Sequence, residues 1–209
     1  DNAPYTALIS VLTTGRGSRI REFTDKGWWG TETIVEKLYT RAVSIPDREA
    51  LIDPYNKKNL VDLEPTRMTY GQMIQAIDRI ALKFIELGIQ KDDVIIVQLP
   101  NIVELTLTIF AASRAGAIVS PIPVQWRAHE IIHAVDLTGA KIFVSSHNLL
   151  GVNHIDLARK SIGENRPLKH YITVSSGKSP GALQMSDILS ADAGDAAVLT
   201  GVHPETITD

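Results

Sequence analysis

Apolar and polar residues follow a regular succession of two patterns from about residue 93 onward. Short continuous apolar runs, typical of strands buried on both faces, are expected to form strands at 93–99, 117–122, 141–146 and 170–176. Segments with apolar residues at three- and four-residue spacing predict helices at about 102–115, 128–138 and 149–162. Strand–helix alternation with short connections predicts an α/β fold with a parallel, doubly wound sheet and flanking helices.

The first part of the chain has a different organisation. A helix is expected at about 32–44, and the segments around a turn-rich DPYNKKN predict a loose β-hairpin over 49–69. Thr69 and Gln72 have the spacing of a capping box, which begins a helix that runs to about Leu87. Three regions are therefore expected: an N-terminal extension with the first helix (1–48), an α/β core with the hairpin (49–176), and a loosely structured tail (177–209).

The segment 102–115 has two features that matter for its surroundings. Asn101 and Glu104 match a second capping box, so Asn101 is expected to cap this helix. Apolar residues then occupy two sides of the helical wheel, one with Leu105 and Ile109 and the other with Leu107 and Phe110. A helix with two apolar sides is covered on both. If one side would otherwise be uncovered, either self-association or coverage by the tail at 177–209 is expected.

Charge and composition exclude several classes of protein. The 21 basic and 24 acidic residues give a net charge of −3 without a basic run, so neither a nucleic-acid nor an anionic-membrane partner is indicated. Cysteine is absent, which excludes disulfides, a thiol nucleophile and Cys-ligated zinc. The most apolar region, 105–124, is interrupted by Arg114 and Pro121 and does not predict a membrane span. With no signal-peptide pattern, these features favour a cytoplasmic protein.

The stretch His129-Glu130-Ile131-Ile132-His133 matches the H-E-x-x-H pattern of many zinc hydrolases. An apolar stripe that includes Ile131 and Ile132 must face the sheet, and this places His129 and His133 roughly 130° away on an ideal wheel. The extended form of the motif would also need His at position 139, where the chain has glycine. A solvated helix face without a metal is therefore expected.

Other nucleotide-binding and catalytic patterns are incomplete. The stretch SSGKS (175–179) follows a strand, but a P-loop needs a glycine where this chain has Ile172, so a surface turn is expected. The residues after the 93–99 strand contain no glycine, which disfavours a dinucleotide-binding Rossmann domain. No G-x-S-x-G sequence nominates a nucleophile, and no catalytic residue is assigned.

Two tryptophan sites have two open interpretations each. Trp28-Trp29 either lines a ligand pocket or, more often for such a pair, anchors the N-terminal segment onto the body of the protein. Trp126 and Arg127 follow the carboxyl end of a predicted strand, where parallel α/β sheets place ligands, and are the only pocket candidates. The alternative is packing by Trp126 at a helix start beside a solvated Arg127.

Several short sequence pieces between residues 68 and 144 stand in a distinctive order and spacing. These are TYGQM (69–73), LGIQKDDV (87–94), VQLPNIVE (97–104), AASRAGAIVSPI (111–122) and TGAK (138–141). In this order and spacing, residues 68–144 resemble the N-terminal part of the AMP-forming acyl-CoA synthetases, in the adenylate-forming superfamily. Upstream, KGWWGTETIVEKL is similar to the entry segment of members that act on aryl and alicyclic acids.

This resemblance implies that the chain is a partial N-terminal domain of an adenylate-forming ligase. The parent would activate an aryl, alicyclic or medium-chain carboxylic acid with ATP and Mg²⁺ and transfer the acyl group to coenzyme A. The family's phosphate loop and catalytic lysine have no counterpart among the 209 residues. The chain by itself is therefore expected to be inactive and to hold no cofactor. The alternative is a stand-alone, non-catalytic scaffold that binds another protein.

Overall fold

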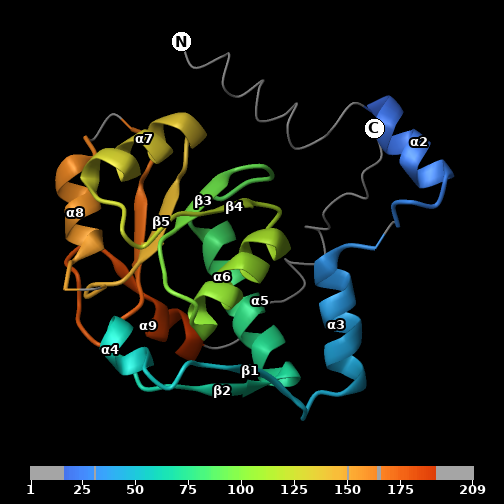
Figure 1. Cartoon of the computed structure of the whole chain (residues 1–209), viewed down its shortest axis with the longest axis horizontal. Helices are drawn as coiled ribbons and strands as arrows, with labels where there is room; N and C mark the ends of the chain where they lie inside the picture. The colour runs from blue at the N-terminus through green and yellow to red at the C-terminus, as the bar shows by residue number, and fades with distance from the viewer. Residues whose placement is uncertain (1–16, 31, 150, 164–165, 192–209) are drawn as a thin grey trace.

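A five-stranded parallel sheet lies at the centre of the computed structural model, which describes residues 17–30, 32–149, 151–163 and 166–191 (Figure 1). The strand order is β4-β3-β5-β6-β7. The strands are β3 (Val94–Val97), β4 (Ile118–Pro121), β5 (Ile142–Ser145), β6 (His170–Thr173) and β7 (Leu183–Gln184). An antiparallel pair, β1 (Glu49–Ile52) and β2 (Arg67–Thr69), forms a separate two-stranded sheet. The predicted parallel α/β sheet and the N-terminal hairpin are thus confirmed.

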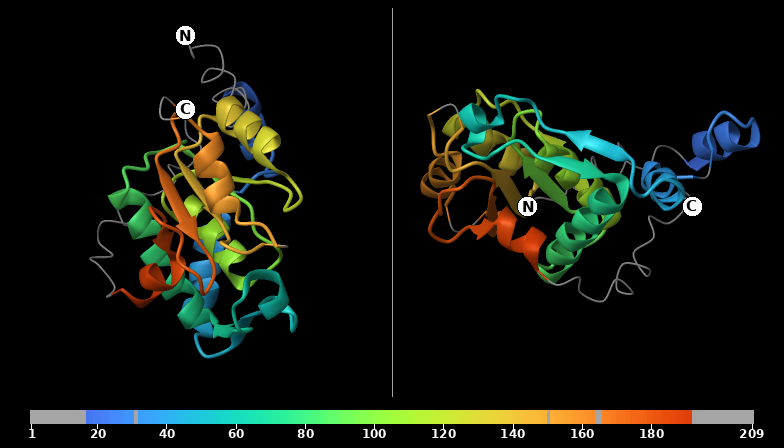
Figure 2. Two further views of the ribbon diagram at one scale, coloured as in Figure 1. Left: turned by 90° about the vertical axis from the view of Figure 1, so that its left-hand side faces the viewer. Right: turned by 90° about the horizontal axis from the view of Figure 1, so that it is seen from below.

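Helices cover both faces of the parallel sheet, as Figure 2 shows in two further views. One layer contains α5 (Tyr70–Glu86), α6 (Val103–Arg114) and α9 (Met185–Ser190), and the other contains α7 (Ala128–Thr138) and α8 (His154–Ser161). Alternate residues of β3 pack against the two layers of helices. Ile95 packs in the core with α5 and α6, whereas Ile96 packs in the core with α7 and α8. Burial on both faces explains the continuous apolar runs of these strands.

The order in which the chain visits the strands creates a switch point. From β3 the chain crosses through α6 to β4, and from β4 it returns through α7 to β5, which pairs with the other side of β3. The helices that follow β3 and β5, α6 and α8, therefore lie on opposite faces of the sheet. In parallel α/β sheets, ligands bind outside the carboxyl ends of the strands at such a point.

The N-terminal helices lie to one side of the sheet (Figure 1). They are α2 (Gly17–Asp25) and α3 (Ile34–Ser44). Tyr39 of α3 donates a hydrogen bond to Oδ1 of Asp78 on α5 at 2.5 Å, and Arg114 of α6 lies 3.3 Å from the same oxygen. Burial and, next, the hydrogen bond to Asp78 raise the pKa of Tyr39 well above its ordinary value. The hydrogen bonds of Tyr39 and Arg114 to Asp78 therefore link α3 to α5 and α6.

Trp28 and Trp29 do not anchor the segment onto the body in the way expected. Their rings pack against Phe23 of the neighbouring α2, with centroid distances of 5.4 and 5.2 Å. Trp28 stays 66% exposed and Trp29 42% exposed. Lys26 lies over the Trp28 ring. The pair therefore organises the turn after α2, because both rings pack against Phe23, which is only five to six residues away.

Several element boundaries differ from those expected. Helix α4 (Lys57–Val61) occupies part of the stretch assigned to a turn. Helix α8 begins at His154 because Leu149 and Val152 pair in a tight turn before it and Asn153 caps it. The segment 183–190, expected to be loose, adds β7 to the sheet and buries Met185 and Ile188 of α9. The remainder of the predicted tail, 192–209, lies outside the described residues.

Helix α6 is covered on one side and partly covered on the other. Leu107 is buried completely, whereas Leu105, Ile109 and Phe110 are half-buried. Helix α3 contacts α6 as well as α5. None of the helices in the described parts of the chain is long and apolar enough to cross a membrane.

Candidate functional site

Polar side chains gather where the chain leaves the carboxyl ends of β3, β5 and β6. The loop after β3 leads into α6, the loop after β5 contains His147 and Asn148, and the loop after β6 contains Ser175 and Gly177. Helix α4, between β1 and β2, adds Asp62 to the same region. Two adjoining groups result: a buried ionic cluster beneath the start of α6, and an open polar pocket.

The buried ionic cluster consists of Asp53, Lys57 and Glu104, together with the hydroxyl of Thr66. Lys57 Nζ lies 2.7 Å from Asp53 Oδ2 and 2.7 Å from Glu104 Oε1. The side chains of Lys57, Asp53 and Glu104 are only 1%, 0% and 11% exposed. One ammonium thus balances two carboxylates, and among the described residues Glu104 Oε2 has no hydrogen-bond partner. The cluster carries one net negative charge inside the fold.

Asp53 also caps α6, which corrects the role expected for Asn101. The helix begins at Val103, and its backbone N–H donates to Asp53 Oδ1 at 2.8 Å. Asn101 is exposed, and Glu104 faces Lys57 instead of a capping partner. A carboxylate at a helix N-terminus accepts an otherwise unpaired N–H and interacts favourably with the helix dipole. The cap therefore comes from a residue fifty positions upstream.

Hydrogen bonds control the ionisation of Asp53. Burial acts to raise its pKa, but hydrogen bonds from Lys57, Thr66 and the Val103 amide outweigh burial and hold the pKa below its usual value. Thr66 contributes twice, through its backbone N–H at 2.9 Å and its hydroxyl at 2.7 Å. Asp53 is therefore a fixed anion at neutral pH. It joins the hairpin, α4 and α6 in one place.

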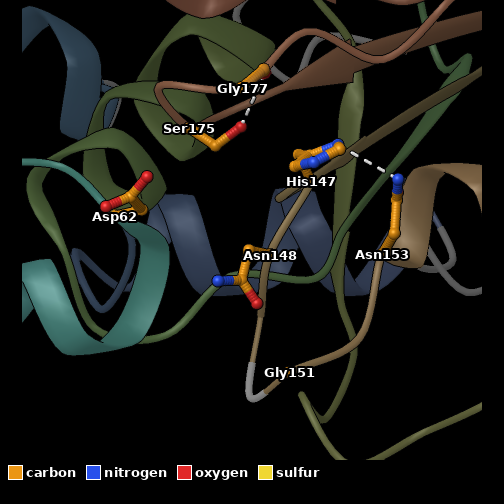
Figure 3. Close-up of a pocket in the computed structure, with 7 residues that line it drawn as sticks. All are labelled: Asp62, His147, Asn148, Gly151, Asn153, Ser175 and Gly177. Atoms are coloured by element: carbon orange, nitrogen blue, oxygen red, sulfur yellow. Dashed lines mark hydrogen bonds between the residues drawn. The ribbon is translucent and has the colours of Figure 1, made fainter.

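The polar pocket has a volume of about 390 Å³ and lies above β5 and β6 (Figure 3). Its lining residues come from α4 and the two loops: Asp62, His147, Asn148, Gly151, Asn153, Ser175 and Gly177. Hydrogen bonds hold the loops together. His147 Nδ1 lies 3.0 Å from Asn153 Nδ2 and 3.1 Å from Ser179 Oγ. Ser175 Oγ donates to the carbonyl of Gly177 at 3.0 Å.

Trp126 and Arg127, the residues proposed from the sequence to line a pocket, lie elsewhere. Trp126 packs half-buried against the core under α7, and its carbonyl accepts a hydrogen bond from Gln98 at 3.1 Å. Arg127 donates to the carbonyls of Val124, Gln125 and Trp126. Neither residue lines the polar pocket. In this structure both residues shape the connection from β4 to α7.

Arg127 also contacts the fully buried His154, at 3.3 Å from Nε2. Burial lowers the pKa of His154 below its ordinary value. Its Nδ1 lies 3.2 Å from the carbonyl of Val152. A neutral histidine that donates to Val152 and accepts from Arg127 satisfies both ring nitrogens, so this pair joins the α7 and α8 starts.

The HEIIH histidines lie on α7, and the SSGKS loop follows β6. His129 and His133 are exposed on α7 while Ile131 is buried, as the helical wheel predicted. Among the described residues, no group of three or more His, Cys, Asp or Glu side chains could hold a metal. The SSGKS segment is more than a surface turn, because Ser175 and Ser179 are buried and Ser179 hydrogen-bonds His147 of the neighbouring loop.

The residues that line the polar pocket do not fit the ATP, Mg²⁺ or coenzyme A that the resemblance implies for a complete ligase. The polar pocket offers a carboxylate and neutral polar groups, with no lysine or arginine among its lining residues to face a phosphate. No step of an adenylation reaction is therefore assigned to these side chains.

Sequence reasoning did not find Asp53, Lys57 or His147. Asp53 and Lys57 stand in a turn-like stretch where charged residues are usually solvated. Their partner Glu104 lies 47 residues after Lys57, and no local pattern connects them. The polar residues His147 and Asn148, directly after the strand predicted at 141–146, were the one available signal, because polar residues beyond the carboxyl end of a parallel strand favour a site.

Comparisons with known proteins agree on one family. The family model described as AMP-binding enzyme matches residues 38–205. The chain is 31% identical over 163 residues to the 2,3-dihydroxybenzoate-AMP ligase of Bacillus subtilis, which covers 78% of this chain and 28% of that protein. The chain spans less than a third of the length of the curated relatives it matches.

Solved structures support the same grouping. The apo structure of Mycobacterium smegmatis MbtA superposes with a TM-score of 0.67 at 26% identity, over 84% of this chain and 30% of that one. A Mycobacterium tuberculosis fatty acyl CoA synthetase superposes with a TM-score of 0.59 at 26% identity, over 77% of this chain and 28% of that one.

Proposed function

The chain belongs to the AMP-binding enzyme family of adenylate-forming ligases, and from this premise we propose that it is the N-terminal part of a carboxylate–CoA ligase. The parent would join a small carboxylic acid to the α-phosphate of ATP, release pyrophosphate, and transfer the acyl group from AMP to the thiol of coenzyme A. The observation that carries the proposal is the family match over 38–205, on a fold that superposes on MbtA and on a fatty acyl CoA synthetase.

An aromatic acid is the substrate class that we favour. The Bacillus relative is named for 2,3-dihydroxybenzoate, and the KGWWGTETIVEKL segment resembles the corresponding entry of aryl-acid members. A medium-chain or alicyclic acid is the alternative within the same chemistry. The name of that relative mentions only the acyl-AMP, so the thiol of a carrier protein is a second candidate acceptor.

Within such a ligase, the described residues would serve as scaffold. The Asp53–Lys57–Glu104 cluster fixes the start of α6 at the carboxyl end of β3. The cluster would keep this edge of the sheet rigid, which is what a neighbouring catalytic loop requires for precise positioning.

The experiment is to read the gene beyond the codon for Asp209, purify the complete product, and incubate it with ATP, Mg²⁺ and a panel of benzoates, cyclohexane carboxylates and C6–C12 acids. Mass spectrometry should detect an acyl-AMP with at least one acid, and coenzyme A should then convert it to a thioester. Conversion only with a phosphopantetheinylated carrier protein would change the acceptor. A stop codon directly after 209, or no acyl-AMP with any acid, would overturn the proposal in favour of a non-catalytic scaffold.

A further inference from the structure

The polar pocket above β5 and β6 contains an unpaired donor whose identity follows from a chain of hydrogen bonds. The backbone N–H of Asp156 can only donate, and it donates to Asn153 Oδ1 at 3.0 Å. Asn153 Nδ2 must then be the donor toward His147 Nδ1, at 3.0 Å. His147 Nδ1 is consequently an acceptor, and the neutral ring carries its hydrogen on Nε2. No acceptor among the described residues bonds this Nε2–H.

The His147 ring is held in place from behind. A Cβ added at Gly177 would lie 2.8 Å from His147 Cδ2 and 3.2 Å from Nε2, so only glycine allows this loop to lie flat against the ring. Ser179 Oγ, 3.1 Å from Nδ1, is a second contact on the same side of the ring. The tautomer and orientation of His147 are both fixed before any ligand arrives.

Asp62 supplies the complementary acceptor (Figure 3). It ends α4 with a left-handed backbone, φ 56°, which is unusual for a residue other than glycine. Ser176 of the β6 loop donates to Asp62 Oδ2, so the carboxylate is held at the pocket. Asn148, which is exposed beside it, adds an amide that both donates and accepts.

We propose that this pocket binds an uncharged polyhydroxyl ligand about the size of a monosaccharide. A hydroxyl both donates and accepts, so neighbouring hydroxyls satisfy Asp62, His147 and Asn148 together. An anion would meet the Asp62 carboxylate with no cation in the lining, and an ammonium group would leave the His147 N–H unsatisfied. The volume of about 390 Å³ lies within the range of small-molecule sites.

The test is equilibrium dialysis of the full chain with radiolabelled D-glucose, with competition by myo-inositol, inorganic phosphate or ethylammonium. A dissociation constant of about millimolar order is expected for a ligand with so few atoms. Myo-inositol should compete, while phosphate and ethylammonium should not. Hydrogen-exchange mass spectrometry should show slower exchange in the loops 146–149 and 174–179 when glucose is present.

Two variants examine the assignment, and a third is the matched control. Asp62→Asn should weaken binding at least tenfold. Asn148→Ala, at an exposed side chain that makes no hydrogen bond with the described residues, should fold normally and also weaken binding. Glu64→Gln, an exposed carboxylate two residues from Asp62 and outside the pocket, should leave binding unchanged. Absence of saturable binding, competition by phosphate or ethylammonium, or unchanged affinity in a folded Asp62→Asn or Asn148→Ala protein would overturn the proposal. Because no step uses ATP or a carboxylic acid, its outcome is independent of the proposed ligase activity.

Discussion

Replacing Lys57 by methionine is the sharpest perturbation of this fold. The Lys57 ammonium lies 2.7 Å from each of two carboxylate oxygens, and its side chain is 1% exposed. Lys57→Met keeps most of the side-chain volume but leaves Asp53 and Glu104 without their shared counter-charge. Removing one member of a buried ion pair typically costs about 3–5 kcal/mol, because the remaining charge is neither solvated nor compensated. That loss is a large fraction of the roughly 5–15 kcal/mol stability of an ordinary domain.

Urea denaturation followed by circular dichroism measures this loss. With a slope of about 2 kcal/mol per M, a loss of about 4 kcal/mol lowers the midpoint by about 2 M. Lys58→Met is the matched control, because the adjacent Lys58 is exposed and pairs with the exposed Glu64; its midpoint should stay near the wild-type value. Adding Glu104→Gln to Lys57→Met removes one of the two uncompensated charges and should recover part of the loss. Equal midpoints for Lys57→Met and Lys58→Met would refute the assignment of a buried, charge-balancing role to Lys57.

Three further predictions concern acid stability, helix caps and association. Because the folded-state pKa of Asp53 is depressed, its contribution to stability is complete above the unfolded pKa of about 3.9 and is lost as pH falls through the lower folded value. The Asp53→Asn variant should therefore show a weaker dependence of the urea midpoint on pH in this acid range. A pH dependence equal to that of the wild type would contradict the ionised cap. Asn153→Ala should lower the free energy of unfolding by about 1 kcal/mol, since Asn153 Oδ1 accepts a hydrogen bond from the Asp156 amide at 3.0 Å. Asn101→Ala should leave the melting curve unchanged. A larger loss of stability for Asn101→Ala than for Asn153→Ala would support the cap expected from the sequence. Light scattering of the 209-residue chain should show self-association through the half-buried side of α6, and a stable monomer at high concentration would show that α3 covers this helix sufficiently.

The sequence predicted correctly those helices and strands whose formation depends on residues close together in the chain. The Thr69–Gln72 capping box is present with both of its hydrogen bonds, and the apolar run over β3 is buried throughout. The predicted helix over 128–138 has the bounds of α7, because its apolar stripe and the terminal Gly139 agree. Burial on two faces gives such strands the continuous apolar sequence from which they were predicted.

Interactions between distant segments could not be predicted in this way. Asn101 and Glu104 match a capping box, yet Asp53 takes the N-terminus of α6 because Lys57 holds Glu104 elsewhere. The polar pocket likewise brings together residues from α4 and two loops, and among them only His147 and Gly177 stand directly after predicted strands. The tryptophan pair shows the opposite case: it was expected to pack against a distant part of the chain, but its partner, Phe23, is close in sequence.

Carboxylate-dependent ATP–pyrophosphate exchange tests the central claim most directly. It should be measured side by side for the 209-residue chain and for the complete product of the gene, with the same panel of aromatic and aliphatic acids. Exchange that requires both a carboxylic acid and Mg²⁺ in the complete product, and stays at background in the 209-residue chain, is the predicted result. Exchange by the 209-residue chain, or none by the complete product with any acid, would contradict the assignment of this chain as the scaffold part of an AMP-forming ligase.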